Sequence, residues 1–184
     1  MNLLHPDHST PSRRSSASSR RRGFLGLGAA IAALGLAGCG FELRKAPVFA
    51  FRTIAVPGNS NIVRMLRRSL PLGGNVQVLP PEQASEADAV LDIVAENQER
   101  GVLSTNSSGQ VRELQLRLKV SFRLVAPRTG KVLLPPTEIV QTRDISFNET
   151  AALAKEGEEQ LLFRDMQNDI VQQMLRRLAA VKEL

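Results

Sequence analysis

The stretch VRELQLRLKVSFRLV, residues 111–125, alternates apolar and polar side chains through six consecutive repeats. The apolar positions are Leu114, Leu116, Leu118, Val120, Phe122 and Leu124. Because side chains of a β-strand point alternately to its two faces, this pattern predicts a strand with one buried and one polar face. At about 3.3 Å per residue it would be roughly 50 Å long, well beyond the usual strand.

Shorter signals flank this strand, and turn residues separate them. Strand-like segments lie at 51–56, 76–79, 89–96 and 137–147, and helical periodicity at 61–70 and 148–182, with a turn at 104–109. The order strand, helix, several strands, helix predicts an α+β fold. We expect two helices packed on one face of a mixed, mostly antiparallel sheet of four to five strands.

The first 38 residues have the composition of a targeting segment. Residues 1–22 are rich in Ser and Arg, and residues 24–37 form an apolar stretch too short for a membrane-spanning helix. A basic region followed by an apolar one of this length predicts a cleaved signal peptide over 1–38. Arg21-Arg22 also fits a twin-arginine export motif, so the Sec and twin-arginine routes both stay open.

The apolar stretch ends in Leu36-Ala37-Gly38-Cys39, which fits the bacterial lipobox. Cleavage before Cys39 would leave this thiol as the attachment point for lipid, with palmitate among the acyl chains, and more than one chain gives a stable membrane anchor. Gly40 follows, not the aspartate typical of inner-membrane retention, so we expect an outer-membrane lipoprotein that faces the periplasm. Residues 39–50 then form an anchored lead-in and 51–184 a single domain.

Removal of residues 1–38 changes the chemistry available to the protein. The whole chain has a formal net charge of +6, but the removed segment carries five arginines, one aspartate and both histidines, so the mature chain has a net charge of +2. This small charge removes the case for a nucleic-acid partner. Without His, Tyr, Trp or a free Cys, Ser-His-Asp and Cys-His catalysis and the usual zinc sites are impossible. We therefore expect no metal, no cofactor and no enzyme; a carboxylate-dependent glycan hydrolase is the one enzymatic alternative left open.

The polar face of the 111–125 strand is basic. It carries Arg117, Lys119 and Arg123 against Glu113. Two interpretations stand side by side: a solvated sheet face, or a surface for an anionic ligand.

The mature sequence resembles the LptE (RlpB) family of lipopolysaccharide-assembly lipoproteins. The resemblance rests on the order and spacing of several short motifs: LAGCGFELR at 36–44, SGQ at 108–110, Arg143-Asp144, Asn148, and ALAK at 152–155. It implies a non-enzymatic protein that binds lipopolysaccharide and forms a plug in the LptD barrel.

The resemblance also implies a site. The lysine of the ALAK motif, here Lys155, is implicated in lipopolysaccharide binding in the family. A second basic residue of the family is replaced by Ser107, and Arg112 could substitute for it. Arg117, Lys119 and Arg123 complete the candidate set. The alternative function is that of a periplasmic lipoprotein that acts as a structural tether or scaffold, with no role in lipopolysaccharide assembly.

Overall fold

The computed structural model describes residues 47–148, 150 and 152–184. The predicted signal peptide, Cys39 and most of the predicted lead-in lie outside these residues. Within the lead-in, the side chain of Phe49 is buried, and its ring stacks on that of Phe51 with the centroids 5.1 Å apart. The core therefore already includes chain that precedes residue 51.

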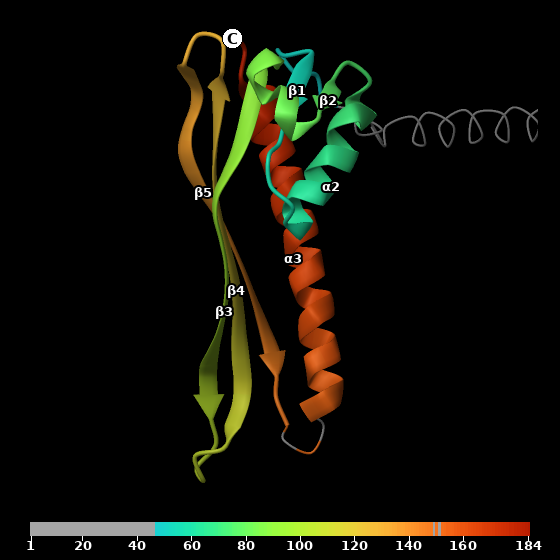
Figure 1. The fold of residues 1–184 in the computed structure, drawn as a ribbon. Coiled ribbons are helices and arrows are strands. Elements are labelled where there is room, and N and C mark those ends of the chain that lie inside the picture. The colour runs from blue at the N-terminus through green and yellow to red at the C-terminus, as the bar shows by residue number, and fades with distance from the viewer. Residues whose placement is uncertain (1–46, 149, 151) are drawn as a thin grey trace, which may run out of the picture. The chain divides into compact units, whose positions relative to one another are not determined.

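Five strands form one mixed sheet in the order β2–β1–β3–β4–β5. They are β1 (Thr53–Ala55), β2 (Gln77–Leu79), β3 (Ala89–Thr105), β4 (Val111–Ala126) and β5 (Lys131–Ser146). The short pairs β1–β2 and β1–β3 are parallel, whereas the long pairs β3–β4 and β4–β5 are antiparallel. Helices α2 (Asn61–Ser69) and α3 (Ala152–Ala180) lie on one face (Figure 1). The predicted α+β architecture is confirmed.

The core lies between the apolar face of β4 and the two helices. All six apolar positions of the 111–125 stretch are at most 4% exposed. Helix α2 begins after Ser60, whose Oγ accepts the N–H of Val63 at 3.3 Å and so caps the helix. Helix α3 buries Met166, Ile170, Val171, Met174, Leu175 and Leu178. The apolar face of α3, which repeats every 3.6 residues, thus packs against the apolar face of β4, which repeats every two residues.

Two strands extend beyond their predicted limits. β3 was expected to end at residue 96 but continues to Thr105, because its second half pairs residue by residue with β4 as far as the hairpin tip. β5 starts at Lys131 and includes Pro135 and Pro136, which a central strand would not tolerate. The prolines lie where the pairing with β4 is irregular, at the edge of the sheet, so their missing N–H groups break little of the ladder.

The carboxylate of Asp88 ties the start of β3 to the start of β1. Its Oδ2 accepts the backbone N–H groups of Arg52 and Thr53, both at 3.0 Å, and the N–H of Asp88 donates to Oγ1 of Thr53 at 2.9 Å. Partial burial raises the pKa of Asp88, but these hydrogen bonds and the charge of Arg128 outweigh it, so the pKa lies below its usual value. The ionised carboxylate therefore stabilises the parallel β1–β3 junction.

Replacing Asp88 by asparagine is expected to lower the free energy of unfolding at pH 7 by about 1–3 kcal/mol, because a neutral amide oxygen accepts the two N–H groups less strongly than a carboxylate does. Because the folded pKa is lowered, the stability that Asp88 contributes is complete above its unfolded pKa of about 3.9 and is lost as the pH falls through the folded pKa. Urea unfolding followed by circular dichroism should show this loss in the wild type and not in Asp88→Asn. Glu82→Gln, at an exposed position, is the control. Equal pH dependence of the free energy of unfolding in wild type and Asp88→Asn would contradict the stabilising role of the Asp88 carboxylate.

Candidate functional site

One end of the sheet gathers the hairpin tip between β3 and β4, the last residues of β5 and the first turns of α3 (Figure 1). We call it the distal end. At the tip, Oδ1 of Asn106 accepts the N–H groups of Ser108 and Gln110, and Gly109 takes a positive φ of 79°. These contacts fix the tight turn that was predicted at residues 104–109.

Lys155 points from the first turns of α3 to the end of β5. Its Nζ lies 3.2 Å from Oγ of Ser146 and 2.8 Å from Oε2 of Glu158, and its side chain is 19% exposed. The ALAK lysine is thus held by a strand end on one side and by its own helix on the other. An ammonium in this position offers a single point charge to an anionic ligand.

Arg112 reaches the same strand end from β4. Its carbonyl oxygen accepts the N–H of Phe147, the residue after Ser146, at 2.7 Å. Its exposed side chain borders a small cavity of about 100 Å³ that Gln110, Val111, Phe147, Asn148 and Thr150 also line. Lys155 contacts Ser146 and Arg112 pairs through its backbone with Phe147, so two candidates that lie far apart in the sequence lie at the same strand end.

Arg100 is a third cation at the distal end, and the sequence did not reveal it. Its Nε lies 3.3 Å from Oε1 of Glu159 on α3, and its guanidinium carbon lies 5.6 Å from the centroid of the Phe147 ring. A cation over an aromatic face is attracted by the ring quadrupole. Arg100 was missed because β3 was expected to end before it, so nothing linked it to α3.

Arg117, Lys119 and Arg123 lie instead on the polar face of β4, away from the helices, and carboxylates of β3 neutralise part of their charge. Nζ of Lys119 lies 2.7 Å from Oε1 of Glu99, and Nε of Arg123 lies 3.0 Å from Oδ2 of Asp92. The hydrogen bond from Lys119, with the charge of Arg117, lowers the pKa of Glu99 although slight desolvation opposes this. The ion pairs are exposed and stabilise the sheet little.

The register of the sheet corrects the expectation of a basic face. The positions opposite the polar side chains of β4 bring Asp92, Glu99, Glu138 and Asp144 onto the same face as Glu113. Five carboxylates thus accompany the three cations, and the face over β3, β4 and β5 is net negative. Whether Arg117, Lys119 and Arg123 bind a ligand stays a prediction.

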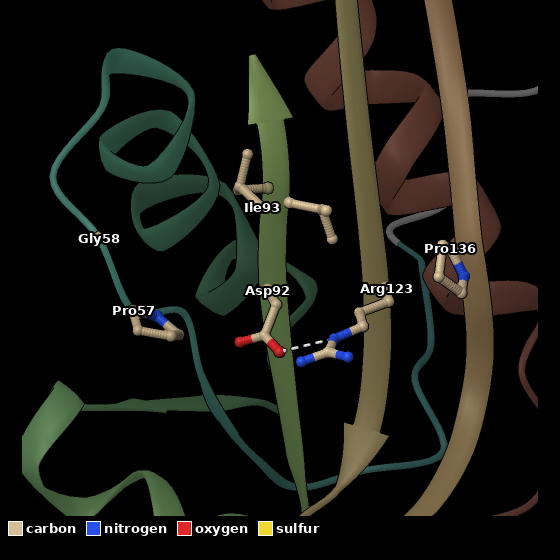
Figure 2. A pocket seen from close by; sticks show the side chains of 7 residues that line it. Pro57, Gly58, Asp92, Ile93, Arg123 and Pro136 are labelled. Atoms are coloured by element: carbon tan, nitrogen blue, oxygen red, sulfur yellow. Dashed lines mark hydrogen bonds and ion pairs between the residues drawn. The ribbon is translucent and has the colours of Figure 1, made fainter.

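A larger cavity of about 570 Å³ lies beside the Asp92–Arg123 pair (Figure 2). Pro57 and Gly58, which follow β1, border it on one side, and Pro136 of β5 borders it on the other. The residues that line this cavity include one carboxylate, that of Asp92, which accepts a hydrogen bond from Arg123. Two convergent acids, as glycan hydrolysis requires, are not present in this cavity. Among the described residues no group of three or more His, Cys, Asp or Glu side chains could hold a metal ion.

The fold defines the class of protein to which the chain is similar. The solution structure of uncharacterized lipoprotein B from Nitrosomonas europaea is 33% identical, with a TM-score of 0.62 over 77% of this chain and 91% of that one. The crystal structure of rare lipoprotein B from Shewanella oneidensis is 27% identical, with a TM-score of 0.59 over 70% and 94%. The sheet and its two helices thus have the same fold as these two lipoproteins. Within residues 47–148, 150 and 152–184, no helix combines the length and apolar character needed to span a bilayer.

Sequence comparison then gives the family. The family model described as LptE: Lipopolysaccharide-assembly matches residues 51–178, most of the described chain. The LPS-assembly lipoprotein LptE of Photorhabdus laumondii is 28% identical over 156 residues, which cover 82% of each chain. That of Yersinia enterocolitica is also 28% identical, over 82% of this chain and 73% of that one. The chain belongs to the LptE family, and its place is in lipopolysaccharide assembly.

Proposed function

We propose that this protein is an outer-membrane lipoprotein, anchored through Cys39, that binds lipopolysaccharide and forms a plug-type complex with the LptD barrel. The family match over residues 51–178 carries the proposal. The protein acts by binding and positioning and performs no covalent chemistry.

The polar sheet face supports a place inside a barrel. β4 alone has 16 residues, about 53 Å of strand, and its outward face presents charged and polar side chains of both signs. The interior of a transmembrane β-barrel is polar, whereas its outer surface is apolar. A long unit with one helix-covered face and one mixed-charge face therefore suits a barrel lumen better than a lipid surface.

The distal end supports lipopolysaccharide binding. The side chains of Arg100 and Lys155 contact Phe147 and Ser146, and Arg112 is hydrogen-bonded to Phe147 through its backbone and borders the adjoining cavity. Guanidinium groups make paired hydrogen bonds to phosphate, and an ammonium adds a point charge, so the three together suit the phosphates of an acidic glycolipid.

Co-purification tests the barrel partnership. The full chain, tagged at its C-terminus and extracted from outer membranes in mild detergent, should bring LptD with it in a constant ratio. Isolation of the folded lipoprotein alone, from membranes that contain LptD, would refute the plug complex. Depletion of this protein from cells distinguishes the proposed function from that of a structural tether or scaffold. Loss of lipopolysaccharide from the cell surface supports a role in assembly, and intact surface lipopolysaccharide supports a scaffold.

Replacing Lys155 by glutamine should weaken lipopolysaccharide binding by about tenfold, because one charge-assisted contact to phosphate is lost. The double variant with Arg112→Gln should weaken it further. Binding of fluorescent lipopolysaccharide measures both, and circular dichroism checks the fold. Lys182→Gln, an exposed lysine beyond the end of α3, is the matched control. Unchanged binding in both variants would place the site elsewhere, with Arg117, Lys119 and Arg123 next to be tested.

A further inference from the structure

The ammonium group of Lys155 is already in contact with a carboxylate of its own helix. Oε2 of Glu158 lies 2.8 Å from Nζ, and the hydroxyl of Ser146 lies on the other side at 3.2 Å. Only 19% of the Lys155 side chain is exposed, against 49% of Glu158. An anion that approaches Lys155 from solvent therefore meets Glu158 and has to replace it.

Glu158 is free to be replaced. The Glu158 side of this pair is half exposed, and ion pairs that water and salt can screen contribute little to stability. The order along the helix, with the lysine before the glutamate, is also the weaker one. When Glu158 rotates into water its charge is fully hydrated, while Ser146 still holds the ammonium of Lys155 in place.

The neighbouring glutamates on α3 are arranged differently. Glu159 points to the sheet and pairs with Arg100, and its side chain is only 13% exposed. Glu156 is exposed and, in the described part of the chain, forms no hydrogen bond or ion pair with Lys155. Among these three acids of the first turns of α3, Glu158 alone contacts Lys155 in the structure.

We propose that Glu158 is a built-in competitor for the anionic group that binds Lys155, and that it makes the site select phosphate over carboxylate. This inference rests on the proposed function. A phosphomonoester carries a charge of about −1.5 to −2 at pH 7 and three acceptor oxygens. A carboxylate ligand carries one negative charge, the same as Glu158. Glu158 competes better for Lys155, because it belongs to the same molecule and is present at a high effective concentration. A phosphate exceeds Glu158 in charge and displaces it.

The test measures binding of fluorescent lipopolysaccharide to the full chain in non-ionic detergent. Glu158→Gln should bind about two- to fivefold more tightly than wild type, the range for losing an ion pair that solvent partly screens. Enzymatically dephosphorylated lipopolysaccharide should bind less tightly than the intact form to wild type, and this difference should shrink in Glu158→Gln. Glu156→Gln, one half-turn away on the same helix, is the matched control for a general loss of negative charge and should change binding little.

A double-variant cycle decides whether the effect passes through Lys155. In the Lys155→Gln background, adding Glu158→Gln should give no gain. A gain in Glu158→Gln no larger than that in Glu156→Gln, or a gain that persists without Lys155, overturns the competitor role and leaves the proposed function intact. Equal binding by wild type and Lys155→Gln would contradict the lipopolysaccharide site itself, and the competitor role with it.

Discussion

Replacing Leu124 by alanine is expected to lower the free energy of unfolding by about 2–5 kcal/mol, a large part of the stability of a domain of this size. Leu124 is fully buried, and its neighbours across the sheet are Leu91 on β3 and Leu134 on β5. Truncation removes apolar contacts on both sides, and the paired strands cannot close the cavity without losing register. Urea unfolding followed by circular dichroism measures the loss.

The chain offers a matched control for this substitution. Leu153 on α3 is 85% exposed, so Leu153→Ala removes the same atoms from solvent rather than from the core. Its free energy of unfolding should stay within about 0.5 kcal/mol of wild type. A similar loss in both variants would mean that β4 does not form the centre of the core, and the α+β packing would have to be reconsidered.

The alternation that reveals β4 depends on its central position. Long strands pair with it on both sides and helices cover one face throughout, so its inward side chains are apolar from Leu114 to Leu124. The second half of β3 lies at an edge, and its positions opposite the apolar residues of β4 include Gln98 and Arg100. These polar residues break the two-residue period, because Arg100 is matched by Glu159 of α3 and not by an apolar partner. Sequence patterning therefore predicted the start of β3 and not its full length.

The candidate site was predictable only in part for a related reason. Lys155 and Arg112 were candidates through the family resemblance, and the structure places Lys155 against Ser146 and the backbone of Arg112 against Phe147. The sign of the net charge on the polar face of the sheet was not predictable, because it depends on which acidic residues of β3 and β5 the strand register places beside β4. The role of Glu158 needs the side-chain geometry as well, because three glutamates in four residues look equivalent in sequence.

Replacing Cys39 by alanine should move the protein from the membrane fraction to the soluble periplasmic fraction. The acyl chains that we expect on this thiol contribute about 0.8 kcal/mol per buried CH₂ group, so more than one chain holds the protein firmly and no chain leaves it without an anchor. The variant is best exported behind an unrelated cleavable signal sequence, because loss of the cysteine also removes the lipobox. Incorporation of labelled palmitate should accompany the wild type and be absent from Cys39→Ala.

Retention by the barrel is the effect that this experiment has to separate from lipid anchoring. If the protein is a plug in LptD, part of Cys39→Ala will stay in the membrane fraction through the partner, and depletion of LptD should release that part. Gly40→Ala, which keeps the thiol and alters only its neighbour, should behave as wild type. Membrane retention of Cys39→Ala after LptD depletion would contradict anchoring at this residue, whereas release on depletion supports the anchor and the plug together, because each then accounts for its own share of the membrane-bound protein.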